Sequence, residues 1–195
     1  MAILCSNCGR QYDVTLFQFG RTIDCACGSR VGLETRINLP ANAALRFFAD
    51  VNVARLTRWL RALSIDTVWE DAIADGDLVR RSLQENRHIL TLDKRLPAEW
   101  HISNVLVFEN EEPLVQLREV IRHFQLSKPE KLFQRCLICN AEMRLARHEE
   151  VLAQVPPEVR ETAQEFSACP SCRKVYWEGS HTKRMRQTIE NIFES

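Results

Sequence analysis

The eight cysteines fall into two sets of four, one on either side of the middle third of the chain. Each set begins with a C-x-x-C pair, and a second close pair follows after an intervening segment. Two such pairs can place four thiolates at the corners of a tetrahedron, the usual ligand shell of structural zinc. Four sulfurs leave no open position, so both sites are expected to be structural rather than catalytic. The sets are Cys5, Cys8, Cys25 and Cys27, and Cys136, Cys139, Cys169 and Cys172.

Buried or disulfide-paired cysteine is the alternative interpretation of both sets. The start, MAILCSNCGR, has no long apolar stretch typical of a secretion signal, so we expect a cytoplasmic protein, in which thiols stay reduced. Gly9 and Gly28 each follow a cysteine pair and suit the left-handed turn of a zinc knuckle. A segment of about 40 residues buries too little surface to fold alone, so bound zinc would supply the missing stability.

Carboxylates follow several apolar runs in the middle of the chain. Asp50 ends LRFFAD, Asp93 ends HILTLD and Glu109 ends NVLVFE, while Asp75 and Asp77 begin an expected helix. Because ligands of a parallel sheet bind at the carboxyl ends of its strands, these acids are expected to gather on one edge. Gathered carboxylates repel one another unless a proton or a hard cation is present. Oxygen ligands favour magnesium or manganese.

The sequence therefore predicts that Asp50, Asp75 and Asp93, here called the acidic rim, hold Mg²⁺ or Mn²⁺ and are catalytic. Asp77 is a further catalytic candidate, and Glu109 an outer one. Two ions about 4 Å apart can activate water and stabilise the leaving oxygen in phosphodiester cleavage. Simpler interpretations exist: Asp75 as a helix N-cap, Asp77 in a favourable helix dipole, Asp93 as a turn residue and Glu109 in solvent.

Polar and basic side chains near the acidic rim are the candidate substrate-binding residues. Asn52 could orient a water or a phosphate, and Lys94 and Arg95 could position the scissile phosphate. A basic row follows on the first helix, for which a solvated helix face is the alternative. The candidates are Asn52, Arg55, Arg58, Lys94 and Arg95, with Arg61 in the same basic row.

The segment VYWEGSHTKRMR (175–186) mixes aromatic and basic residues. Tyr176, Trp177 and His181 among lysine and arginine suit stacking on nucleic-acid bases. Aromatic packing within a small ribbon is the alternative. His181 is not expected to bind zinc, because four sulfurs already complete the shell.

Strands and helices alternate through the middle of the chain. Helices are expected after Asp50 with Val53, Leu56, Leu60 and Leu63 on one stripe, at Asp75 or Asp77, and at Pro113. This alternation predicts an α/β fold, a small parallel sheet with helices on both faces, flanked by N- and C-terminal zinc ribbons. In the C-terminal ribbon an insertion contains a short helix that begins at Pro157. The expected strands are 45–50, 66–71, 88–93 and 104–109.

Composition limits the alternatives only broadly. The formal net charge is zero, which removes the simplest argument for a nucleic-acid partner, and the apolar share is normal for a globular protein. No stretch approaches the roughly 18 apolar residues of a membrane span, so no membrane partner is expected. The predicted domains are an N-terminal zinc ribbon (1–44), a core (45–126) and a C-terminal zinc ribbon (127–195).

Three separated motifs resemble the Mut-seven C-terminal ribonuclease domain family, a PIN-like nuclease fused to a zinc ribbon. They are FFADVNVARLTRWLRAL, DGDLVRRSLQENRHILTLDKRL and RCLICNAEMR with CPSCRKVYWEGSHTKRM, in the expected order. The resemblance covers about 46–186 and implies a PIN-like fold and a metal-dependent ribonuclease. By motif, it assigns the acidic positions to Asp50, Asp75 (with Asp77 beside it) and Asp93.

The chain departs from the family pattern at two places. An arginine commonly precedes the last aspartate in that family, and Leu92 stands here. The pair that often follows the first aspartate, methionine-leucine or acidic-leucine, is replaced by VNV (51–53). The N-terminal cysteine module lies outside the resemblance and is interpreted only as a second zinc ribbon, for RNA or protein docking.

The leading hypothesis is a metal-dependent ribonuclease that hydrolyses RNA phosphodiester bonds, endonucleolytically. The alternative is a zinc-ribbon adaptor that binds RNA or the ribosome and has an inactive nuclease site, since a fold does not fix function. A third hypothesis is a phosphoaspartate hydrolase with Asp50 as nucleophile. It lacks the acid expected two residues later, where Asn52 stands.

Overall fold

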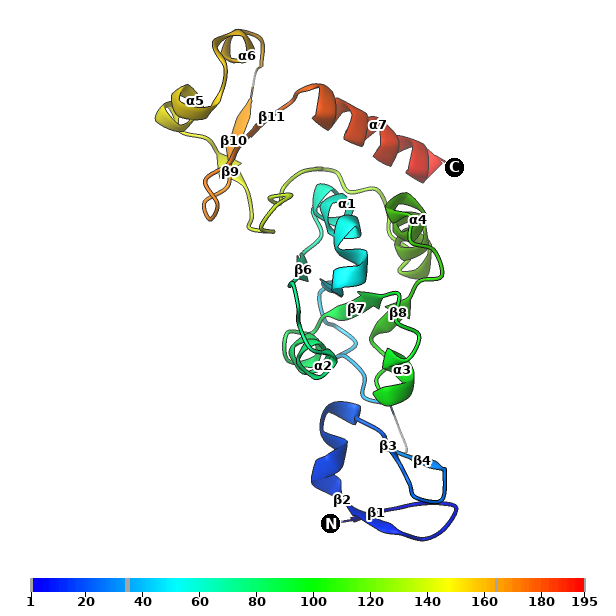
Figure 1. Cartoon of the computed structure of the whole chain (residues 1–195). Coiled ribbons are helices and arrows are strands. Elements are labelled where there is room, and N and C mark those ends of the chain that lie inside the picture. The colour runs from blue at the N-terminus through cyan, green and yellow to red at the C-terminus, as the bar shows by residue number, and fades with distance from the viewer. Residues whose placement is uncertain (1, 34–35, 164, 195) are drawn as a thin grey trace. The chain divides into compact units, whose positions relative to one another are not determined.

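The computed structural model describes residues 2–33, 36–163 and 165–194. The chain forms two compact units, and Figure 1 labels the helices and strands. The first unit contains residues 1–54 and 69–111, and the second contains 55–68 and 112–195. The domain limits at 44 and 126 stay a prediction. No helix of the described residues combines the length and the apolar character that crossing a membrane requires.

The α/β prediction is confirmed by a four-stranded parallel sheet with the strand order β6-β5-β7-β8. The strand β7 pairs in parallel with both its neighbours: Phe48 of β5 lies opposite Ile89, and Leu106 of β8 lies opposite Leu90. Strands of such a sheet are covered on both faces, which explains their continuous apolar sequences. All the expected strands are present, each shorter than its apolar run. Their bounds are β5 (Phe47–Ala49), β6 (Thr67–Trp69), β7 (His88–Thr91) and β8 (Val105–Val107).

Two helices of the first unit lie on either side of β7 in the sequence. Helix α2 (Asp75–Gln84) buries Leu78 and Val79, as its apolar spacing predicts. Helix α3 (Leu96–Glu99) has only four residues and was not expected, because so short a segment carries no periodic signal. Together with the strand ends, these helices position the side chains of the candidate site.

The helix expected directly after Asp50 begins differently from the prediction. Residues Val51–Leu56 form a 3-10 segment (η2), and the α-helix α1 covers only Thr57–Ala62. Val53 breaks the regular backbone, with φ −121° and ψ 18°. The apolar stripe is nevertheless correct, since Val53, Leu56, Leu60 and Leu63 are all buried.

The N-terminal module, residues 2–33, consists of two short hairpins joined by a 3-10 segment. Its small core contains Cys5, Phe17, Cys25 and Val31, so two of the cysteines are themselves core residues. Gly9 and Gly28 adopt φ of +71° and +86°, which confirms the left-handed turns after the cysteine pairs. The elements are β1 (Ala2–Leu4), β2 (Gln11–Asp13), η1 (Val14–Gly20), β3 (Ile23–Asp24) and β4 (Arg30–Val31).

The second unit contains α1, the helix α4 (Pro113–His123) and an antiparallel ribbon of order β11-β10-β9. Pro113 and Pro157 begin helices as predicted. The final helix α7 was missed, although Met185, Ile189 and Ile192 have helical spacing. The remaining elements are β9 (Arg144–Leu145), α5 (His148–Gln154), α6 (Pro157–Thr162), β10 (Phe166–Ala168), β11 (Val175–Trp177) and α7 (Ser180–Glu194).

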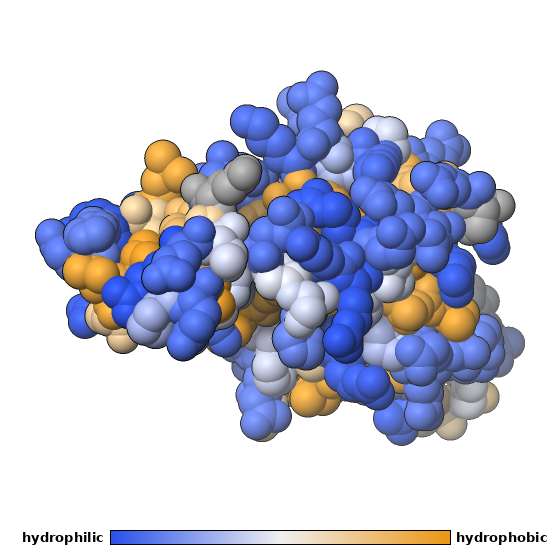
Figure 2. Space-filling model, turned by 90° about the horizontal axis from the view of Figure 1, so that it is seen from above, coloured by the Kyte–Doolittle hydropathy of each residue, from blue (hydrophilic) through white to orange (hydrophobic). Residues whose placement is uncertain are grey.

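The surface is predominantly hydrophilic on the face drawn in Figure 2, where the hydrophobic patches are separate from one another. This agrees with a chain of which 27% is charged.

Candidate metal and catalytic sites

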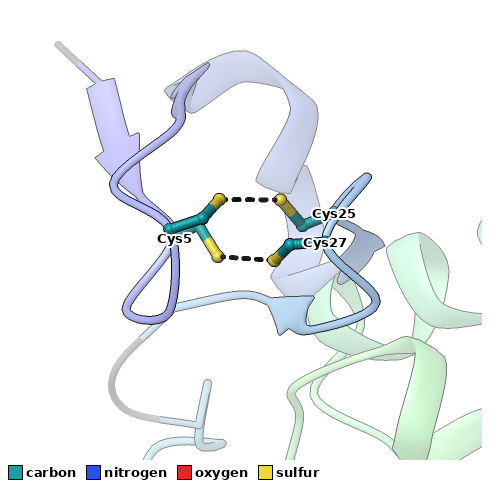
Figure 3. Close-up of side chains that lie close together, drawn as sticks. Cys5, Cys25 and Cys27 are labelled. Carbon is teal, nitrogen blue, oxygen red and sulfur yellow. Dashed lines mark hydrogen bonds between the residues drawn. The ribbon is translucent and has the colours of Figure 1, made fainter.

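The first cysteine set forms one cluster in the N-terminal module. Figure 3 shows sulfurs from the turn after β1 facing sulfurs from the turn after β3. The Sγ atoms of Cys5 and Cys27 lie 3.7 Å apart, and those of Cys8 and Cys25 lie 3.5 Å apart. Tetrahedral zinc with Zn–S bonds of about 2.3 Å requires sulfurs about 3.8 Å apart. The donor set therefore fits a structural zinc ion.

The second cysteine set forms a similar cluster in the C-terminal ribbon. Its Sγ atoms lie 3.6 Å apart for Cys136 and Cys172, and 3.3 Å apart for Cys139 and Cys169. All eight cysteines are free thiols, since a disulfide would bring sulfurs to about 2.05 Å. The disulfide alternative is thus wrong, and the two four-cysteine clusters can each hold zinc. The Tyr176 hydroxyl also lies 3.2 Å from the Cys136 sulfur.

Proton affinities within each cysteine cluster are split. Hydrogen bonds from Ser29, first of all from its backbone N–H, lower the pKa of Cys27 to about 5. Although the Arg10 backbone favours the thiolate, neighbouring sulfurs raise the pKa of Cys8 to about 11. Burial acts against the Cys139 thiolate, yet the Ala141 backbone N–H and the nearby sulfurs lower its pKa to about 6. Burial raises the pKa of Cys172 to about 12. A separation into high and low pKa values is expected where thiols lie close together, because the charge of one thiolate opposes the ionisation of its neighbours.

Arg61 was expected on a basic helix face, and that expectation is wrong, because Arg61 is buried at 3% exposure. Its guanidinium donates to the carbonyls of Leu137 (3.2 Å) and Ile138 (2.7 Å), both between Cys136 and Cys139. Burial lowers the pKa of Arg61, while the charges of the two cysteines oppose this. Four thiolates and one Zn²⁺ would carry a net charge of about −2, for which Arg61 would be a buried counter-charge.

Asp50 begins the acidic rim at the carboxyl end of β5. Its Oδ2 accepts hydrogen bonds of 2.7 Å from the Asn52 amide and from the Thr91 hydroxyl. Its Oδ1 accepts a third, also 2.7 Å, from the Val51 backbone N–H. The Thr91 hydroxyl in turn accepts from the Asp93 backbone N–H at 2.9 Å, which links two aspartates through one buried side chain. Thr91 was not among the predicted site residues, because a threonine inside an apolar strand looks like an ordinary strand residue.

Asp93 follows β7, whose parallel neighbour is β5, so Asp50 and Asp93 occupy the same edge of the sheet. The Asp93 carboxylate is paired with Arg95: Oδ1 accepts from Arg95 Nε at 3.2 Å and from the Arg95 backbone N–H at 2.9 Å. Hydrogen bonding by the Arg95 side chain, followed by its backbone, lowers the pKa of Asp93. The Asp93 carboxylate is therefore ionised, and it is already paired with the Arg95 guanidinium.

Asp75 is the first residue of α2, and the helix N-cap is Ala74 without a side-chain cap. The interpretation of Asp75 as the N-cap is therefore wrong. Partial burial raises the pKa of Asp75, and the negative charges of Asp50, Asp93 and Glu99 raise it further. Asp50 and Asp93 thus lie close enough to Asp75 for their charges to affect its pKa. Glu99 is an additional acid that was missed, because it lies on the unexpected helix α3.

Two more of the predicted site residues of this unit, Asp77 and Lys94, are in ion pairs. The Asp77 carboxylate accepts from Arg80 at 2.8 Å, and Lys94 donates to Glu109 at 2.5 Å. The cysteine clusters are the groups within the described residues whose ligand atoms all lie within 4.8 Å of one another, and the acidic rim is not so tight. Its donor set of carboxylates suits Mg²⁺ or Mn²⁺, provided that Asp93 exchanges Arg95 for the ion.

Two grooves of the second unit carry the other predicted substrate-binding residues. Arg55 and Arg58 line a groove of about 340 Å³ together with Trp59 and His181. A larger groove of about 520 Å³ lies on the C-terminal ribbon, and its lining includes Phe133, Tyr176, Trp177, Lys183 and Arg186. The Arg186 guanidinium lies 5.5 Å from the centre of the Phe133 ring, a cation–π contact.

Fold and clusters together describe an α/β domain with a parallel sheet and a four-cysteine ribbon, accompanied by a second four-cysteine module. Residues 45–189 match the family model described as the Mut7-C RNAse domain, and the chain belongs to this ribonuclease family. The match contains the sheet, the acidic rim and the C-terminal cysteines, and it leaves out the N-terminal module. Neither a curated protein nor a solved structure matches the chain.

Proposed function

We propose that the protein is a metal-dependent endoribonuclease whose active site is the acidic rim. The observation that carries the proposal is the position of Asp50 and Asp93 after two paired parallel strands, where the Thr91 hydroxyl links them. Partial burial, and after it the charges of Asp50 and Asp93, raise the pKa of Asp75 beside them. Such carboxylates repel one another without a cation, so the rim stores charge that a divalent ion would neutralise. Membership of a ribonuclease family supports RNA as the substrate.

Asp50, Asp75 and Asp93 would hold the ion, and Asp77 and Glu99 would be outer groups. When bound there, Mg²⁺ or Mn²⁺ supplies Lewis acidity, which activates water and stabilises the leaving oxygen. Asn52 and Thr91 fix the Asp50 carboxylate with one hydrogen bond each, so its position does not depend on the ion. Such outer partners orient metal ligands and are costly to remove.

Arg95 has two proposed roles in succession. Without an ion it pairs with Asp93, and with an ion it becomes free to contact a phosphate oxygen in a bidentate fashion. Lys94 is placed beside it but is held by Glu109 in an exposed pair, which contributes little stability and is easily broken. Both residues are therefore available to RNA at little energetic cost.

The two grooves of the second unit are further proposed RNA contacts. Arg55 and Arg58 offer cations to phosphates beside the aromatic Trp59. Phe133, Tyr176 and Trp177 offer aromatic rings beside Lys183 and Arg186, a combination that suits unpaired bases. Single-stranded RNA is therefore the proposed substrate class.

The test uses purified protein and two forms of one unstructured RNA, linear and circular. An endonuclease cuts both forms in Mn²⁺ or Mg²⁺, whereas an exonuclease cannot begin on a circle. Asp50→Asn and Asp93→Asn are each expected to reduce the rate by at least about 100-fold. Asp71→Asn, which changes an exposed acid of the same unit, is the matched control. Equal cutting by the control and the two rim variants contradicts the proposal.

One observation favours the adaptor alternative, namely the pairing of Asp93 with Arg95. If that ion pair persisted with metal present, the rim would bind no ion and the grooves alone would act. Manganese titration decides between the two: an adaptor binds RNA with wild-type affinity, shows no Mn²⁺ site that Asp50→Asn removes, and does not cut.

A further inference from the structure

We propose that the N-terminal module is a positioning element for the acidic rim, and that Thr22 and Arg30 are its positioning residues. The inference rests on the proposed function, in which the rim holds the metal. The module lies outside the matched family domain, which begins at residue 45. The role of the module is therefore inferred from its contacts with the rest of the first unit.

Helix α3 ends on carbonyls that the module satisfies. A helix this short leaves its last carbonyls without intrahelical partners. The Ala98 carbonyl accepts from the Thr22 hydroxyl at 3.0 Å and from Arg30 Nη1 at 2.8 Å. The Glu99 carbonyl accepts from the Thr22 backbone N–H at 2.6 Å, and it lies 2.9 Å from the Thr22 hydroxyl, whose single hydrogen is shared between the two carbonyls. Thr22 and Arg30 together form the C-terminal cap of α3.

The residues after α3 are held from two sides. The Gly20 carbonyl accepts from the His101 backbone N–H, and the Arg21 guanidinium lies 5.8 Å from the centre of the Trp100 ring. The far edge of that ring lies 3.4 Å from the position a Cβ on Gly76 would take. Gly76 directly follows Asp75. The N-terminal module and α2 thus both contact the segment around Trp100.

The other end of α3 reaches the acidic rim. The Arg95 carbonyl accepts from the backbone N–H groups of Ala98 (2.8 Å) and Glu99 (2.9 Å), so the helix is one rigid turn. Arg95 also pairs with Asp93, and Glu99 acts electrostatically on Asp75. A displacement of the capped end would therefore move two charged groups relative to the rim.

The cysteine cluster controls the spacing of the cap. Thr22 directly precedes β3 and Arg30 begins β4, and Cys25 and Cys27 lie in the turn that joins these strands. Backbone hydrogen bonds from Cys25 to Ser29 and from Gly28 to Cys25, both 2.8 Å, close this turn. Zinc at the cluster would fix the turn and with it the cap. Metal occupancy of the module is thus coupled to the metal affinity of the rim, a reciprocal linkage.

The test compares Thr22→Val with Thr22→Ser in the full-length protein loaded with zinc. Valine removes the hydroxyl and keeps the methyl group that lies against Gly32, whereas serine keeps the hydroxyl. Thr22→Val is expected to weaken Mn²⁺ binding at the rim about tenfold and to speed amide exchange in residues 96–102, with zinc content unchanged. Thr22→Ser should restore wild-type Mn²⁺ affinity.

A second pair keeps the proposal testable if Thr22→Val folds poorly. Arg30→Met removes the guanidinium contact with Ala98, and Arg10→Met changes an exposed arginine of the same module. Only Arg30→Met should weaken Mn²⁺ binding. Wild-type Mn²⁺ affinity in both Thr22→Val and Arg30→Met overturns the positioning role alone. If the wild-type protein has no Mn²⁺ site that Asp50→Asn removes, the proposed function fails and the coupling fails with it.

Discussion

The two cysteine clusters have the same ligands and nearly the same geometry, but their surroundings differ. In each cluster two cysteines are buried and two exposed. The C-terminal cluster has the Arg61 guanidinium behind it and the Tyr176 hydroxyl against one sulfur. In the N-terminal module the corresponding cation, Arg30, is half exposed and turned toward Asp24 and the Ala98 carbonyl.

This difference teaches that ligand spacing does not decide how firmly a metal is held. A zinc ion with four thiolates would be a partly buried anion, and a buried charge is costly unless a partner compensates it. In the C-terminal cluster that partner is Arg61, which is buried in the fold, whereas Arg30 of the N-terminal module is half exposed. We therefore expect the C-terminal zinc to be structural and inert, and the N-terminal zinc to exchange more readily.

Arg61→Met gives the largest expected effect on this comparison. It removes the counter-charge and leaves the Leu137 and Ile138 carbonyls unpaired, at a cost of about 3 kcal/mol. For a chain of this size the melting temperature should fall by about 6–12 °C. Differential scanning calorimetry measures the change, with Arg58→Met on the exposed side of the same helix as the control. A loss equal to that of the control would remove the counter-charge from the explanation.

Gly20→Ala tests the contact between the N-terminal module and the residues that follow α3. Gly20 has φ of +80°, and an added Cβ would lie 3.0 Å from the His101 carbonyl oxygen. The substitution should cost about 2 kcal/mol through both backbone strain and this contact. Gly9→Ala has a similar φ of +71° with no atom within 4 Å, so it should cost about 1 kcal/mol. Urea unfolding compares the two, and equal costs would show that the contact with residue 101 contributes nothing.

The order of zinc release sharpens the comparison further. A metallochromic chelator should remove one zinc per chain about tenfold faster than the other, equivalent to about 1.4 kcal/mol in the barrier. Cys8→Ser should abolish the fast phase, and Cys139→Ser the slow phase. The reverse assignment would contradict the role given to Arg61.

Asp75→Asn has the smallest expected effect and extends the comparison to the acidic rim. Because the folded-state pKa of Asp75 is raised, folding favours its protonated form. Its stability penalty is absent below the ordinary pKa of about 3.8, grows as pH rises through the raised pKa, and is constant above it. The variant should therefore be more stable than wild type at pH 7 and equal to it at pH 3.

The magnitude of that gain is limited by the exposure of Asp75. Solvent screening should hold it to about 1 kcal/mol or less, or at most about 2–4 °C in melting temperature. Added Mg²⁺ should reverse the order at pH 7, because the ion stabilises only the folded wild type. Thermal melts at both pH values, with and without Mg²⁺, measure this, and a pH-independent difference would contradict the electrostatic origin.

Much of the architecture follows from the sequence because its signals are local. Cysteine spacing locates both metal clusters, and apolar runs that end on carboxylates locate the strands and one edge of the sheet. Pro113 and Pro157 begin helices because proline loses nothing at a first helical position.

The missed features depend on contacts between distant segments. Arg55, Arg58 and Arg61 look like one basic row, but a helix turns about 100° per residue, and the 3-10 start shifts the phase again. Arg61 consequently faces the ribbon, a contact with residues 137 and 138 that no local pattern indicates. Thr91 and Glu99 were missed for the same reason, since only the folded chain brings them to Asp50 and Asp75.

The environment of Trp100 has a consequence for fluorescence measurements. Its indole is 8% exposed and lies against Gly76, one residue from Asp75, whereas Trp69 is 37% exposed. A buried indole emits at shorter wavelength than an exposed one, and a paramagnetic ion nearby quenches it. Trp59 and Trp177 are partly buried and also emit, so the difference between wild type and Trp100→Phe isolates the emission of Trp100. If the acidic rim holds Mn²⁺ as proposed, quenching of that difference signal would report metal occupancy without any label.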